Sequence, residues 1–125
     1  MLDEDAPLFS QIAERLAEDI IDGSLAEGDR VPSSNELAAY YRINPATAAR
    51  GINTLVDEGL LEKRRGIGMF VADGARARLI SQRRQLFAER YIEPLVAEAN
   101  RLGIGAAEAS ALLEKALRHQ GGVKA

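Results

Sequence analysis

The fold class is indicated first by residues 29–50, which read DRVPSSNELAAYYRINPATAAR. Ser33 and Glu36 have the spacing of a capping box, in which each side chain accepts a hydrogen bond from the other residue's backbone N–H, so a short helix is expected to begin there. Asn44 and Pro45 are residue types favoured at the N-cap and first position of a helix, so a second helix is expected to follow. Two helices joined by so short a link predict a helix-turn-helix.

Another helix and a hairpin are predicted on either side of this stretch. Apolar residues at helical spacing over 8–22 predict a helix that ends at Gly23. The helix that opens at Pro45 is expected to stop at Gly59. Residues 59–72 contain two short extended runs around a glycine-containing turn, which is typical of a β-hairpin. The order of three helices and a hairpin predicts a winged helix-turn-helix.

The residues after the hairpin are predicted to be helical and to dimerise. Helical spacing covers 75–102, with a local bend expected at Pro94, and a last helix is expected over 106–118. One short helix cannot cover the apolar stripe of the longer one, so a second copy of the chain is the expected partner. The alternative is that these helices pack on their own winged domain. The side chains expected in the dimer interface are Leu79, Leu86, Phe87, Tyr91, Leu95, Leu112, Leu113 and Leu117.

Together these patterns predict a mostly α fold with a small β-hairpin wing, in which a winged helix-turn-helix is followed by a two-helix C-terminal dimerisation arm. The predicted domains are residues 1–74 for DNA binding, 75–120 for dimerisation and 121–125 for a flexible tail. Four arginines near the start of the arm are interpreted as a solvated face, with phosphate contact as the alternative. They are Arg76, Arg78, Arg83 and Arg84.

A helical wheel indicates what the helix beginning at Pro45 presents to solvent. Its apolar face is formed by Ala48, Ile52, Leu55 and Val56, and Arg50 lies nearly opposite that face. A guanidinium directed away from the core suits the major groove of DNA, where it can pair with a guanine edge or hold a phosphate. The N–H groups after Asn44 can bind phosphate as well. The alternative is that Arg50 is an ordinary solvated residue.

Charge is divided unevenly along the chain. The formal net charge is −3, and it divides into −8 over residues 1–41, +1 over 42–75 and +4 over 76–125. The overall acidity argues mildly against nucleic-acid binding, but it resides mainly in the first third. In the hairpin turn, Arg65 and Gly66 form a basic, glycine-containing tip that suits a phosphate or a narrow minor groove. An ordinary turn with solvated arginines is the alternative.

Several other classes of protein are excluded by composition. The chain has 125 residues, no cysteine and a single histidine, His119, so no set of catalytic or metal-binding residues converges and neither an enzyme nor a cofactor is expected. No run of 18 apolar residues is present, which argues against a membrane span. Residues 1–5 carry three acids, so no secretory signal is expected and the predicted location is the cytoplasm.

Four segments resemble, in order and at the expected spacing, the winged-helix domain of GntR-family transcription regulators. They are DRVPSSNELA at 29–38, INPATAAR at 43–50, LVDEGLL at 55–61 and RGIGMFV at 65–71. The resemblance covers about residues 8–72, and the short C-terminal region is similar to that of the YtrA subfamily. It implies DNA contacts from Ser33, Ser34, Asn35, Asn44, Ala46, Thr47, Arg50, Arg65, Gly66 and Gly68.

The expected function is therefore sequence-specific binding of double-stranded DNA. The resemblance implies a homodimer that represses transcription from an inverted-repeat operator, often of a transporter operon, with half-sites about 10 bp apart. The alternative is a winged-helix module that binds proteins through its acidic first third. A small-molecule effector stays open, because no set of residues indicates its chemistry.

Overall fold

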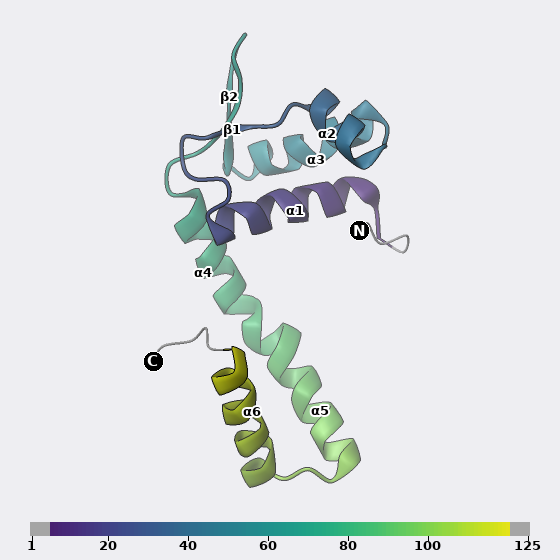
Figure 1. Ribbon diagram of the computed structural model, residues 1–125, viewed down its shortest axis with the longest axis vertical. Helices are drawn as coiled ribbons and strands as arrows, with labels where there is room; N and C mark the ends of the chain where they lie inside the picture. Colours follow the sequence, from purple (N-terminus) through teal and green to yellow (C-terminus); the bar gives the residue numbers. More distant parts are fainter. Residues whose placement is uncertain (1–5, 121–125) are drawn as a thin grey trace. The chain divides into compact units, whose positions relative to one another are not determined.

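The computed structural model describes residues 6–120, and its elements follow the predicted order (Figure 1). In chain order they are α1 Leu8–Asp22, β1 Arg30–Val31, α2 Ser34–Tyr41, α3 Pro45–Asp57, β2 Leu61–Arg64, β3 Gly68–Val71, α4 Ala75–Phe87, the π-helical segment η1 Ala88–Ile92, α5 Glu93–Leu102 and α6 Ala106–Gln120. The predicted fold class, mostly α with a small β wing, is confirmed. The chain divides into two compact units between Gln82 and Arg83. The tail predicted over 121–125 lies outside the described residues.

Local capping explains where α2 and α3 begin. The Ser33 hydroxyl accepts a hydrogen bond from the Glu36 N–H at 3.1 Å, and the Glu36 carboxylate accepts one from the Ser33 N–H at 2.9 Å. The Asn44 side chain accepts one from the Ala46 N–H at 2.8 Å. Between the two helices Arg42 adopts a left-handed φ of 58° and ends α2. Both predicted helix starts are therefore formed.

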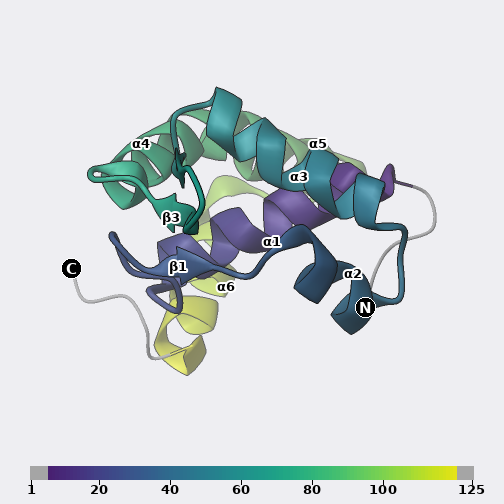
Figure 2. The same cartoon turned by 90° about the horizontal axis from the view of Figure 1, so that it is seen from above.

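In the first unit α1, α2, α3 and the wing lie together (Figure 2), and they share one core with the start of α4. Its largest fully buried side chains are Ile12, Ile20, Val31, Leu60 and Val71. The three strands are antiparallel in the order β1-β3-β2, so β3 is the centre of the sheet. The predicted hairpin is thus confirmed, and a short strand from before α2 completes the sheet.

Glycine at position 51 allows α1 and α3 to approach closely. A Cβ atom on Gly51 would lie 2.8 Å from the Phe9 carbonyl oxygen and 2.9 Å from the Ile12 Cβ. Both distances are shorter than real Cβ contacts, and the oxygen belongs to backbone that cannot swing aside. No larger residue therefore fits without moving one helix away from the other.

The start of α4 belongs to the first unit, although it was predicted to open the dimerisation arm. Ala75 and Leu79 are buried in the core of the winged unit. The Arg76 guanidinium donates to the Ile21 carbonyl at 2.9 Å, near the end of α1. Arg78 donates to the Glu58 carbonyl at 2.8 Å and to the Gly59 carbonyl at 3.2 Å, just after α3. The interpretation of Arg76 and Arg78 as a merely solvated face is therefore wrong, because both cap helix ends.

The second unit has no buried side chain in its described part, residues 83–120. The bend predicted at Pro94 takes the form of η1, whose wider turn is closed by a hydrogen bond from the Glu93 N–H to the Ala88 carbonyl. A π turn just before proline fits the loss of the Pro94 backbone donor. α5 ends at Gly103 in the left-handed region, and α6 follows.

Candidate nucleic-acid interface

The start of α2 is held by its own side chains. Ser33 is half-buried, while Asn35 beside it is exposed. Hydrogen bonds from the Ser33 backbone N–H and side chain hold the pKa of Glu36 below its ordinary value, and the charge of Arg30, 3.7 Å away, acts in the same direction. The hydroxyl oxygen and N–H of Ser33 are thus already paired, whereas Asn35 projects into solvent.

The start of α3 differs from the expectation of a free anion-binding terminus. The Asn44 side chain occupies the Ala46 N–H, and the Asn44 carbonyl accepts from the N–H groups of Thr47 and Ala48 at 3.0 and 3.2 Å. These donors are therefore already paired within the first turn of α3, and phosphate binding by them stays a prediction. The side chains of Asn44 and Ala46 are exposed and that of Thr47 is half-buried, so this turn still presents a small polar surface.

Arg50 is exposed on α3, as the helical wheel predicts, but its side chain reaches back toward α1. Its guanidinium carbon lies 3.7 Å from the centre of the Phe9 ring. No sequence pattern indicates this contact, because a helical wheel describes the direction of the Cα–Cβ bond and not that of a long side chain. Phe9 is thus a residue of the site that sequence reasoning missed.

The wing places a second arginine over a second phenylalanine. The guanidinium carbon of Arg64 lies 4.1 Å from the centre of the Phe70 ring on the neighbouring strand. Arg65 and Gly66 follow in the turn, where Gly66 has a left-handed φ of 77°. The tip therefore combines an exposed arginine with backbone that only glycine adopts readily.

Strand pairing brings one further basic residue to the wing. β1 and β3 are neighbours, and a Cβ on Gly68 would lie 3.1 Å from the Arg30 guanidinium. Arg30 was not predicted in the site, since a two-residue strand leaves almost no sequence pattern. Gly68 accordingly has a packing role beside Arg30 in addition to its predicted place in the wing.

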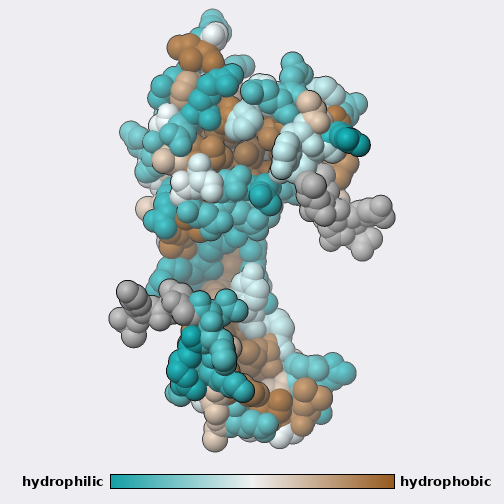
Figure 3. Space-filling model, viewed as in Figure 1, coloured by the Kyte–Doolittle hydropathy of each residue, from teal (hydrophilic) through white to brown (hydrophobic). Residues whose placement is uncertain are grey.

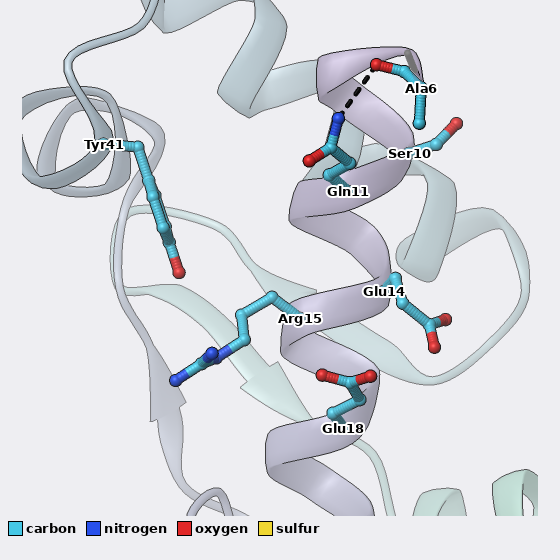
Figure 4. A pocket seen from close by; sticks show the side chains of 7 residues that line it. All are labelled: Ala6, Ser10, Gln11, Glu14, Arg15, Glu18 and Tyr41. Atoms are coloured by element: carbon cyan, nitrogen blue, oxygen red, sulfur yellow. Dashed lines mark hydrogen bonds between the residues drawn. The ribbon is translucent and has the colours of Figure 1, made fainter. Parts of the chain in front are cut away.

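A shallow pocket of about 360 Å³ lies beside α1 (Figure 4). Figure 4 shows Glu14, Arg15 and Glu18 on α1, with Tyr41 across from them at the end of α2. Partial burial raises the pKa of the Tyr41 phenol. Arg15 is within 3.6 Å of Asp19. Because the lining mixes carboxylates with a paired arginine, it does not select a ligand class.

Two further properties of the described residues bear on the site. None of the helices in 6–120 is long and apolar enough to span a membrane. Within the same residues, no three His, Cys, Asp or Glu side chains gather where they would bind a metal ion.

The predicted interface residues of the helical arm divide into two groups. Leu79 is only 4% exposed and lies in the core of the winged unit, so its assignment to a dimer interface is wrong. The seven-residue spacing between Leu79 and Leu86 predicted that both belong to one apolar stripe. In the structure Leu79 instead packs into the core of the winged unit. The rest lie on the second unit, where Leu86 is half-buried and the others are exposed: Phe87, Tyr91, Leu95, Leu112, Leu113 and Leu117. Exposed apolar residues that the prediction missed there are Ile92 and Val96.

The family model of the bacterial regulatory proteins, gntR family, matches residues 8–71. This chain belongs to the gntR family. It is 29% identical over 98 residues to the HTH-type transcriptional repressor YtrA of Bacillus subtilis, which covers 78% of this chain and 75% of YtrA. The resemblance found in the sequence is thereby confirmed.

Solved structures of gntR-family proteins have the same fold. A putative transcriptional regulator of the family from Bacteroides thetaiotaomicron has a TM-score of 0.72 and 30% identity, covering 90% of this chain and 98% of that one. The DNA-binding domain of AraR in complex with operator ORX1 has a TM-score of 0.52 and 32% identity, covering 57% of this chain and 87% of that domain. The winged unit is thus similar to a domain whose structure was solved on DNA.

Proposed function

We propose that this gntR-family protein is a sequence-specific DNA-binding regulator that acts in the cytoplasm as a homodimer on an inverted-repeat operator. The observation that carries the proposal is the exposed start of α3 with Arg50, set in a winged unit similar to the operator-bound AraR domain. Arg50 would read a base edge in the major groove, and Arg65 at the wing tip would follow the backbone or minor groove.

The homodimer is supported by the apolar surface of the second unit (Figure 3). A groove of about 370 Å³ lies between α5 and α6, lined mainly by apolar side chains that include Leu95, Leu102, Leu112 and Leu113. Leu102 is 63% exposed and Leu112 53%. Contiguous apolar surface of this kind marks an interface in a water-soluble unit, and a two-fold partner would place two winged units on two half-sites.

We propose that the protein represses transcription rather than activating it, because YtrA is a repressor and matches most of this chain. A repressor of this kind would bind over a promoter and block transcription, with a transporter operon as the expected target. A small-molecule effector is left without an assigned site.

The test begins with selection of duplexes from a random pool by the full-length chain. We expect one inverted repeat to be enriched and its affinity to fall steeply between about 50 and 200 mM salt, as phosphate contacts release counterions. Arg50→Ala should reduce affinity for that duplex by about 10- to 100-fold while leaving the sedimentation of the free protein unchanged. If no duplex is bound even at low salt, the proposal fails and a protein-interaction module becomes the better explanation.

A further inference from the structure

The contact between Arg50 and Phe9 joins the recognition helix to the first turns of α1. Phe9 is half-buried, so packing restrains its ring, while Arg50 is exposed. At 3.7 Å between the guanidinium carbon and the ring centre, the cation lies well within the range of a favourable cation–π interaction. The half-buried phenylalanine ring therefore forms a surface against which the exposed guanidinium rests.

The position of that surface is set by Gly51, the residue after Arg50. Because Gly51 has no side chain, α3 lies directly against the backbone of Phe9 and the side chain of Ile12. Any shift of α1 away from α3 would carry the Phe9 ring away from the guanidinium. The stacking thus depends on the close approach of α1 and α3 at Gly51.

A stacked guanidinium keeps its donors free. The ring contacts the face of the planar group, whereas all five N–H donors lie in its plane and point outward from the edge. The Arg50 guanidinium has no hydrogen-bond or ion-pair partner among residues 6–120. An arginine in solution samples many rotamers, and holding it by one face reduces the entropy that is lost when its edge binds a partner.

We propose that Phe9 is a positioning residue for base recognition: it holds Arg50 so that the edge donors face a guanine in the major groove. This inference deepens the proposed function and rests on it. Phe9 itself contacts no base, and acts only through the arginine. It extends the determinants of operator specificity from the helix-turn-helix to α1.

The experiment compares ring-containing and ring-free side chains at position 9. The probes are the duplex selected by the wild-type chain and a scrambled duplex of the same composition. Phe9→Leu keeps an apolar side chain but removes the ring, and should weaken binding to the selected duplex about tenfold with no change for the scrambled one. Phe9→Tyr retains the ring and should bind like the wild type. Thermal unfolding shows whether Phe9→Leu is folded, and Phe9→Met is a second ring-free variant to use if it is not.

Two readouts separate positioning from a merely structural role. Repeating the selection with Phe9→Leu should relax the preference at one base pair per half-site, the same one that Arg50→Ala relaxes. In the Arg50→Ala background, Phe9→Leu should have no further effect on affinity. Phe70→Leu is the matched control, since it removes the ring beneath Arg64 and should leave that base preference intact.

Three outcomes would overturn the proposal: equal weakening on both duplexes, an undiminished effect in the Arg50→Ala background, or a Tyr variant as weak as the Leu variant. Each leaves the regulator function standing, because the wild-type chain still enriches a duplex. A wild-type chain that enriches none overturns the proposed function itself.

Discussion

The two units of this protein differ in whether they bury their apolar side chains. In the winged unit, buried side chains run from Ile12 to Leu79 and come from every helix and strand. In residues 83–120 of the helical unit none is buried, and large apolar side chains are exposed instead. The first unit therefore has its own core, whereas the second leaves apolar faces exposed, which the proposed function assigns to a second copy of the chain. Under the proposed function, DNA binding and assembly would therefore be carried by separate parts of one chain.

The largest expected effect comes from emptying the core of the winged unit. Ile12→Ala removes a fully buried side chain beneath the α1–α3 contact and should lower the free energy of unfolding by about 3 kcal/mol, through lost burial and the cavity left behind. Urea denaturation followed by circular dichroism measures the change. Leu8→Ala, at an exposed position of the same helix, is the control. A loss below about 1 kcal/mol for Ile12→Ala would contradict a self-sufficient core.

The next effect tests whether a second copy covers the helical unit. Leu113→Asp places a carboxylate on the α5–α6 groove and should weaken dimerisation by about 2 kcal/mol, or roughly 30-fold, because the charge would be buried at the interface. Sedimentation equilibrium measures the dissociation constant. Lys115→Asp, an exposed polar position on α6, should leave it nearly unchanged. An unaltered dimer in the Leu113 variant would place the interface elsewhere.

A smaller effect is expected where α4 meets the winged unit. Arg78→Met retains an aliphatic side chain but removes the hydrogen bonds to the Glu58 and Gly59 carbonyls, and should destabilise the winged unit by about 1 kcal/mol. Thermal unfolding of the variant measures it. Arg84→Met on the same helix serves as the comparison and should have little effect. Equal losses in both variants would show that general charge, and not helix capping, is responsible.

The smallest effect concerns the capping box of α2. The folded state lowers the pKa of Glu36 from its ordinary value of 4.5, so the ionised carboxylate favours folding. That contribution is complete above about pH 4.5 and is lost as the pH falls through the lower pKa of the folded state. Glu36→Gln should therefore flatten the pH dependence of the melting temperature as the pH falls below the ordinary pKa of 4.5. An identical profile in wild type and variant would argue against a role for the Glu36 charge.

Features of the sequence predicted the fold wherever the deciding interactions are local. The capping of α2 and α3 depends on residues two or three positions apart, so Ser33 and Asn44 were sufficient to indicate both helix starts. Contacts between distant residues were not predictable. Phe9 and Arg50 meet only because Gly51 lets two helices touch, and the burial of Leu79 depends on which face of α4 the core takes.

The agreement between predicted and observed fold does not extend to the functional residues. The DNA contacts proposed for α2, α3 and the wing remain predictions, as do the roles given to the predicted domains. The structure adds the contacts that several of these side chains and backbone N–H groups make within the chain itself. Arg50 and Arg64 each lie over a phenylalanine ring, while the first N–H groups of α3 are already paired.

The anchoring of α4 to the winged unit has a consequence for protein engineering. Leu79 is the last buried residue of the core, and Arg78 caps the end of α3. The contacts that α4 makes with the winged unit therefore lie within its first turns. The helix after Gln82 is then a natural place to graft a different dimerising helix. If the protein acts as proposed, such a chimaera should keep the half-site preference of the parent protein while changing the spacing between two half-sites, which would make operator sequence and operator geometry independently adjustable.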